Sequence, residues 1–303
     1  MIFRLLVIFF LFISFQLPQK DPFIVVLGTA QDAGYPQIGC DKECCKKYWD
    51  KKIAKQKVSC IALFDPSTNQ KWIFDATPDL TEQLHDAEVL QKGNLSGIFL
   101  THAHIGHYTG LMYLGREALS AKEIPVYVMS RMHGYLKNNG PWSQLINLNN
   151  IKLQNLKADS SIKLTDKISI TPILVPHRDE FSETVGYSIK TENKTVLFIP
   201  DIDKWQKWDR DIRQLIKSHD YLFLDGTFYK DGELPGRNMS EVPHPFVQES
   251  MELFKDLLLA EKQKIWFIHF NHTNPLIDNS SNEYKEVKSN GFNVAVEGSR
   301  IIL

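Results

Sequence analysis

The stretch "THAHIGHYTG" at residues 101–110 places three of the ten histidines of the chain within six residues. His102 and His104 alternate along an extended segment, so their side chains are expected to point to the same side. Two imidazoles on one side of a tight loop can bind one cation, because histidine is the commonest metal ligand. His107 lies across a turn and is expected to face a neighbouring cation. The stretch therefore predicts a metal site.

The rest of the chain alternates between short apolar runs and helical patterns. No repeat or low-complexity linker interrupts residues 21–303, which predicts one α/β domain. Two segments, 130–150 and 227–243, are predicted to be loops that build a pocket. The predicted strands are 23–28, 60–65, 71–76, 97–102, 125–129, 168–177, 185–190, 195–201, 221–226, 264–270 and 294–303, and helical spacing marks 80–91, 209–219 and 244–261.

Further candidate ligands stand where predicted strands end. His177 follows "PILVP", Asp201 follows "VLFIP", and His269 lies near the end of "KIWFI". Side chains at the ends of several strands can converge on one rim of a sheet sandwich, where a site explains polar residues better than core packing does. We expect these residues to join the histidines of 101–110.

Charge and the N-terminal segment limit the partners. The formal net charge is -1 over 303 residues, so neither nucleic acid nor an anionic membrane surface is expected as a partner. We expect a small-molecule substrate, and the oligomeric state stays open. Residues 1–20 carry one arginine followed by an apolar run at 5–15. This pattern is typical of a signal peptide or an N-terminal anchor, and it predicts a periplasmic, secreted or membrane-anchored protein.

The ligand pattern resembles that of the metallo-β-lactamase superfamily, whose signature is HxHxDH after a strand with a His, an Asp and a last His downstream. The resemblance implies a four-layer αββα sandwich. Five segments in order resemble the pyrroloquinoline-quinone biosynthesis protein B (PqqB) group, and a "GC…C" stretch with HxxH near the C-terminus resembles the cyclic phosphodiesterase (PhnP) branch. The five segments are "VLGTAQDAGYPQIGC", "DATPDLTEQL", "THAHIGHYTGL", "VPHRDEFSETVGYSI" and "IHFNHTNP".

The resemblance assigns the candidate ligands to two metal positions. This sequence departs from the family pattern at Gly106, where the family has an aspartate that binds the second metal. Glycine offers no ligand, so both a one-metal and a two-metal enzyme stay open. The resemblance implies that His102, His104 and His177 hold the first metal, that His107 and His269 hold the second, that Asp201 bridges them, and that Asp75 in "FDATPD" orients a ligand histidine from the second coordination shell.

The cysteines suggest a second kind of metal site. Cys40, Cys44 and Cys45 lie within six residues, a spacing that favours a metal clamp over disulfides. By resemblance to the phosphodiesterase branch, Cys40, Cys45 and His272 would hold a structural zinc, with Cys44 as the remaining ligand. Free or disulfide-bonded thiols are the alternative, and His272 could instead serve the active site.

A histidine before a helix completes the candidate site. His244 in "SEVPHPFVQES" resembles the proton donor of related phosphodiesterases; a histidine without a catalytic task is the alternative. We expect a hydrolase in which one or two Zn²⁺ ions activate water, with Asp201 and His244 as catalytic residues. An Fe²⁺-dependent oxygenase acting on a quinone-cofactor precursor is the second hypothesis, and a non-catalytic metal-binding or carrier protein is the third.

Overall fold

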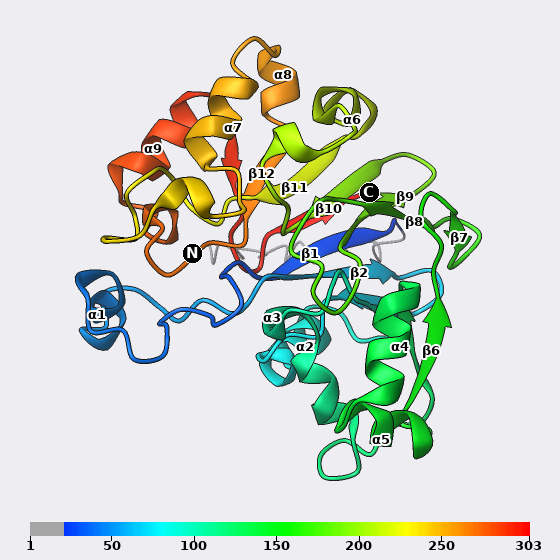
Figure 1. Ribbon diagram of the computed structural model, residues 1–303. Coiled ribbons are helices and arrows are strands. Elements are labelled where there is room, and N and C mark those ends of the chain that lie inside the picture. The colour runs from blue at the N-terminus through cyan, green and yellow to red at the C-terminus, as the bar shows by residue number, and fades with distance from the viewer. Residues whose placement is uncertain (1–20) are drawn as a thin grey trace, which may run out of the picture.

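Two seven-stranded β-sheets packed face to face form the centre of the computed structural model, which describes residues 21–303 (Figure 1). The signal peptide or anchor predicted for residues 1–20 lies outside the described residues. Within residues 21–303, no helix has both the length and the apolar character needed to cross a membrane.

The first sheet has the strand order β14-β1-β2-β3-β4-β5-β6. Its strands are antiparallel from β14 to β3 and parallel from β3 to β6, so that β3, β4 and β5 end at the same edge. The strands are β1 (Phe23–Gly28), β2 (Cys60–Asp65), β3 (Gln70–Phe74), β4 (Asn94–Phe99), β5 (Ile124–Val128), β6 (Ile151–Asn155) and β14 (Arg300–Ile302).

The second sheet has the order β13-β12-β11-β10-β9-β8-β7. Strands β10 to β13 are parallel, and β7 to β10 are antiparallel. The strands are β7 (Ile162–Lys163), β8 (Ser169–Leu174), β9 (Val185–Lys190), β10 (Thr195–Ile199), β11 (Tyr221–Asp225), β12 (Ile265–Ile268) and β13 (Asn293–Val294).

Helices cover both outer faces of the sandwich (Figure 1). On the first sheet lie α2 (Leu80–Leu90), α3 (Ile105–Tyr108), η1 (Thr109–Leu114), α4 (Ser130–Asn138) and α5 (Trp142–Asn147). On the second lie η2 (Trp205–Lys207), α6 (Ile212–Ser218), η3 (Met239–Glu241), α7 (Val247–Leu253), α8 (Leu259–Lys262), η4 (Pro275–Ile277) and α9 (Asn282–Ser289). The remaining helix, α1 (Glu43–Trp49), stands apart from the sheets (Figure 1).

Three buried layers follow from the alternation of side chains along the strands. The middle layer lies between the sheets and contains Phe74 and Phe99 of the first sheet with Tyr187 and Phe198 of the second. Each outer layer joins one sheet to its helices. This arrangement is the four-layer αββα sandwich predicted from the sequence.

Three predicted segments differ from the structure. The run 294–303 is not one strand, because Gly298 adopts φ 81 and turns the chain from β13 in one sheet to β14 in the other. The helical pattern 244–261 is two helices: Glu249 accepts the N–H of Phe246 before α7, and Glu261 accepts that of Leu258 before α8. Segment 130–150 is not a loop, because it contains α4 and α5.

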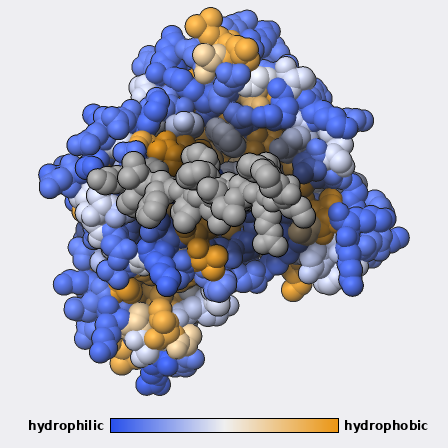
Figure 2. Space-filling model, turned by 180° about the vertical axis from the view of Figure 1, so that it is seen from behind, coloured by the Kyte–Doolittle hydropathy of each residue, from blue (hydrophilic) through white to orange (hydrophobic). Residues whose placement is uncertain are grey.

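The surface seen from behind is mostly hydrophilic, with small groups of hydrophobic residues (Figure 2). One group lies at the top of that view, in the region of α8, where Leu258 and Leu259 are exposed. The scattered pattern is that of an ordinary water-facing surface.

Candidate metal centre

Loops at one edge of the sandwich hold the candidate ligands, as the strand-end pattern predicts. His102 and His104 follow β4, His177 follows β8, and Asp201 follows β10. His269 comes directly after β12. The ends of these strands from both sheets meet at this edge, so residues that lie far apart in the sequence become neighbours.

The first cluster contains His102, His104, His177 and Asp201. One ligand atom from each lies within 4.8 Å of the others. Oδ2 of Asp201 is 3.3 Å from Nε2 of His102, 3.2 Å from Nε2 of His177 and 3.9 Å from Nδ1 of His104. Three imidazoles and one carboxylate around one point match the ligand chemistry of zinc.

The ligand atoms of this cluster fit a cation because they have no other partner. Nε2 of His102, Nδ1 of His104 and Nε2 of His177 are buried and have no hydrogen-bond partner among the described residues. An unpaired buried polar atom costs free energy, and native proteins rarely leave several together. A metal ion among them would satisfy all three nitrogens.

The second cluster contains His107, His269 and a residue that the sequence analysis missed, Asp32. Oδ1 of Asp32 is 3.1 Å from Nε2 of His107 and 3.9 Å from Nε2 of His269. The two Nε2 atoms are 3.3 Å apart. One signal in the sequence pointed to Asp32: it closely follows the strand 23–28, as the other carboxylates of the site follow theirs.

The structure differs from the expected bridging position of Asp201. Its Oδ2 faces the first cluster, and its Oδ1 lies 3.2 Å from Nδ1 of His244. The rings of His102 and His107 are 4.2 Å apart between centroids, so the two clusters are neighbours. His107 thus faces a separate position, as its place across the turn predicts.

Each clustered histidine has a neighbour at its second ring nitrogen. Such contacts fix the tautomer and orient the ring toward a metal. Asp75 occupies the position expected of it, since its Oδ2 accepts from Nδ1 of His107 at 2.7 Å. The other contacts are His102 Nδ1 to Thr101 Oγ1 at 2.9 Å, His104 Nε2 to Glu180 Oε2 at 3.2 Å, His177 Nδ1 to Asp203 Oδ1 at 3.5 Å, and His269 Nδ1 to Thr227 Oγ1 at 2.9 Å.

Two residues of the site adopt a left-handed backbone. Asp75 has φ 72 and His269 has φ 70, although neither is glycine. This conformation costs about 1–3 kcal/mol for such residues and is concentrated at functional sites. The surrounding hydrogen bonds hold it: the N–H of Asp75 donates to the carbonyl of Phe99 at 2.8 Å.

Burial and the neighbouring carboxylates shift the pKa values of the clustered histidines in opposite directions. Burial lowers the pKa of His102 well below its usual value. Burial also opposes protonation of His177, but the Asp201 carboxylate outweighs it and raises the pKa of His177 to about 9. For His107 the carboxylate of Asp75 prevails over burial, and the pKa rises well above its usual value. The carboxylates of Asp201 and Asp75 thus favour a positive charge beside them, which is the charge that a metal ion would supply.

His244 lies beside the first cluster, just before α7. Its Nδ1 is 2.9 Å from Oδ2 of Asp225, the last residue of β11. Burial lowers the pKa of His244, but Asp225 and Asp201 raise it to about 10. Its ring centroid is 5.5 Å from that of His177. Asp225 therefore lies where it can orient the ring of His244.

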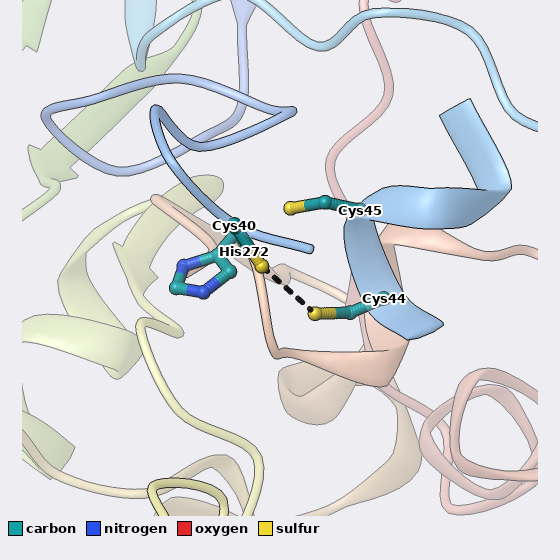
Figure 3. Close-up of side chains that lie close together, drawn as sticks. All are labelled: Cys40, Cys44, Cys45 and His272. Atoms are coloured by element: carbon teal, nitrogen blue, oxygen red, sulfur yellow. Dashed lines mark hydrogen bonds between the residues drawn. The ribbon is translucent and has the colours of Figure 1, made fainter. Parts of the chain in front are cut away.

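The cysteine cluster lies around α1 (Figure 3). Cys44 and Cys45 belong to α1, Cys40 precedes it, and His272 comes from the loop after β12. The four ligand atoms lie within 4.8 Å of one another, and the cysteines are free thiols. Sγ of Cys40 and Sγ of Cys44 are 3.8 Å apart, too far for a disulfide bond.

The fold and the clustered histidines define a class. Residues 70–270 match the family model described as the beta-lactamase superfamily domain, and the chain belongs to this superfamily. The protein called coenzyme PQQ synthesis protein B is a relative along the full length. The chain is 25% identical to the one from Methylococcus capsulatus, over 92% of this chain and 99% of the relative. It is 28% identical to the one from Pseudomonas putida, over 93% of this chain and 100% of the relative.

Solved structures share the fold. Zn²⁺-bound PqqB from Methylobacterium extorquens superposes with a TM-score of 0.79 at 21% identity, over 93% of this chain and 100% of that one. A diphosphatase of the PhnP family gives 0.65 at 20% identity, over 93% of this chain and 97% of that one. The chain thus resembles both groups named from its sequence.

Proposed function

We propose that the chain is a metal-dependent hydrolase in which a metal-activated water attacks an ester, amide or phosphodiester bond, with a phosphodiester as the preferred substrate. The observation that carries the proposal is the first cluster, in which His102, His104, His177 and Asp201 place four ligand atoms within 4.8 Å. Zinc is the proposed metal. When bound, it lowers the pKa of a coordinated water and polarises an oxygen of the substrate.

The chain's own residues would orient the ligands and supply a proton. Asp75, Thr101 and Thr227 accept hydrogen bonds from ligand histidines and keep their other nitrogens directed into the site. Asp225 accepts a hydrogen bond from Nδ1–H of His244. That contact leaves the His244 Nε2 proton for the oxygen of the leaving group.

His244 could meet a need that alkyl phosphodiesters share with alkyl esters and amides, namely a proton for the leaving group. The alkoxide that leaves a phosphodiester is a strong base and needs a proton as the bond breaks. A buried imidazole held between two carboxylates is well placed to carry that proton. The fold shared with a PhnP-family diphosphatase supports the same class of chemistry.

The test is an assay of the zinc- and manganese-loaded protein on cyclic and linear phosphodiesters, with the His104→Ala variant as the control expected to be inactive. The proposal expects metal-dependent turnover that His104→Ala loses. Equal turnover by both proteins would contradict it, as would the absence of turnover on esters, amides and phosphodiesters with every metal.

An oxygenase acting on a quinone-cofactor precursor is the second candidate function. The full-length similarity to coenzyme PQQ synthesis proteins at 25–28% identity favours it. Histidine and carboxylate ligands suit Fe²⁺ as well as Zn²⁺. Oxygen uptake by the Fe²⁺-loaded protein with such a precursor, together with no hydrolysis, would select this candidate over the first.

We also propose a structural zinc at Cys40, Cys44, Cys45 and His272. Four thiol and imidazole ligands without an open position are typical of structural zinc sites. Nδ1 of His272 is buried without a hydrogen-bond partner among the described residues. The cluster joins α1 to the loop after β12, so the ion would fix a helix that stands apart from the sheets.

A further inference from the structure

Position 106 is a glycine for which the backbone conformation gives no reason. Gly106 lies in α3, and its φ is not positive, so any residue could adopt its conformation. A glycine inside a helix costs about 1 kcal/mol relative to alanine. Some neighbour must therefore exclude a side chain from this position.

That neighbour is Asp32. A Cβ placed on Gly106 would lie 2.4 Å from Cα of Asp32 and 2.4 Å from its Oδ1. Both distances are far shorter than contacts between non-bonded atoms allow. The backbone and the side chain of Asp32 therefore fill the space that an aspartate at position 106 would occupy.

The backbone fixes Asp32 next to His269. The N–H of Gln31 donates to the carbonyl of Phe270 at 2.8 Å, and the N–H of Phe270 donates to the carbonyl of Thr29 at 2.7 Å. The side-chain amide of Asn271 donates to Oε1 of Gln31 at 2.6 Å. These hydrogen bonds join the loop after β1 to the segment after β12. They therefore hold Asp32 close to His269.

The side chains around Asp32 converge as ligands do. Oδ1 of Asp32 is buried and has no hydrogen-bond partner among the described residues. The Nδ1 atoms of His107 and His269 are already bonded to Asp75 and Thr227, which directs both Nε2 atoms toward Asp32. Two imidazole nitrogens and one carboxylate oxygen within 4.8 Å suit a divalent transition-metal ion.

We propose that Asp32 replaces the carboxylate missing at position 106 and, with His107 and His269, binds a second divalent metal ion beside the first cluster. The carboxylate ligand then comes from the loop after β1 instead of the histidine-rich loop. The absence of a side chain at Gly106 leaves room for Asp32. The inference deepens the proposed hydrolase function by making its centre binuclear, and it rests on that function for its catalytic meaning.

The experiment counts metal ions per chain in purified protein by elemental analysis and measures Zn²⁺ binding to the metal-free chain by calorimetry. Asp32→Asn keeps the shape of the side chain but removes its charge, and Asp32→Ala removes the ligand oxygens while the backbone beside Gly106 stays as it is. Asp86→Asn, a carboxylate change on α2 away from the clusters, is the matched control. Circular dichroism checks that each variant is folded.

We expect Asp32→Asn and Asp32→Ala each to lose one ion per chain, and Asp86→Asn to lose none. An Asp32→Asn protein with the full count and unchanged Zn²⁺ affinity would overturn the proposal. So would a folded Asp32→Ala protein that keeps the full count. The outcome is separable from the proposed function: if His104→Ala also leaves the count unchanged, the hydrolase proposal fails as well.

Discussion

Nδ1 of His107 donates a hydrogen bond to Oδ2 of Asp75 across 2.7 Å, and both side chains are fully buried. Asp75 also accepts from the N–H of Thr101 at 2.8 Å. One carboxylate thus orients a candidate ligand and fixes the start of the histidine-rich loop. Asp75 makes both contacts from a left-handed backbone conformation.

Asp75→Asn is expected to weaken metal binding by about 10–100-fold, because the amide is a poorer acceptor for the His107 N–H. Competition with a chromophoric chelator measures the affinity. Asp65→Asn is the matched control, since Asp65 is also a buried carboxylate but ends β2 beside the first residue of β3, far from the clusters, where it accepts from Ser67. Equal metal affinities of the two variants would mean that Asp75 does not orient a ligand.

His244→Gln is expected to keep its metal and to lose about 10²–10⁴-fold in turnover of an alkyl phosphodiester. A nitrophenyl diester should lose far less, because nitrophenolate leaves without a proton. Steady-state rates on the two substrates measure the difference, with His133→Gln on α4 as the control. The same loss on both substrates would rule out His244 as the proton donor.

Cys45→Ser is expected to lose one zinc per chain and to unfold more easily. At a free zinc concentration of 100 times the Kd, binding adds about 2.7 kcal/mol to the free energy of unfolding. Denaturant unfolding with and without chelator measures this, and the chelator should destabilise wild type more than the variant. Cys60→Ala removes a buried thiol outside the cluster and should keep the zinc count. Unchanged zinc in Cys45→Ser would remove the structural site.

The ion pair between Lys47 and Asp278 should give an acid-dependent contribution to stability. Nζ of Lys47 lies 2.8 Å from Oδ2 of Asp278 and joins α1 to the segment after η4. Hydrogen bonds from Lys47 and Ser280 lower the pKa of Asp278 from 3.8 to about 2. A lowered carboxyl pKa means that the contribution is complete above pH 3.8 and disappears as the pH falls through about 2.

Lys47→Met is therefore expected to lower stability by less than about 1 kcal/mol at pH 6, since the pair is partly exposed. The difference from wild type should shrink as the pH falls through about 2 and vanish below it. Thermal unfolding at several pH values measures it, and Lys52→Met, which removes an exposed pair with Asp50, is the control. A difference that does not shrink as the pH falls through this range would show that the ion pair is not its cause.

The sequence predicted the fold, and it named most of the residues that the structure brings together, because residues at strand ends are local signals. An apolar run precedes each of His102, His177 and Asp201, and this pattern can be read from the sequence alone. Asp32 was missed because its meaning depends on the space at Gly106, which is 74 residues away. The separation of β13 from β14 was missed because the run 294–303 is apolar at both ends and polar only over residues 297–300.

The most direct test of the metal centre is a crystal structure of the purified protein with anomalous data at the zinc edge. We predict a peak at about 2.0–2.2 Å from Nε2 of His102, Nδ1 of His104 and Nε2 of His177, with Oδ2 of Asp201 beside it. The absence of any peak among these four residues in zinc-grown crystals, with the side chains arranged as in this structure, would contradict a metal-dependent function.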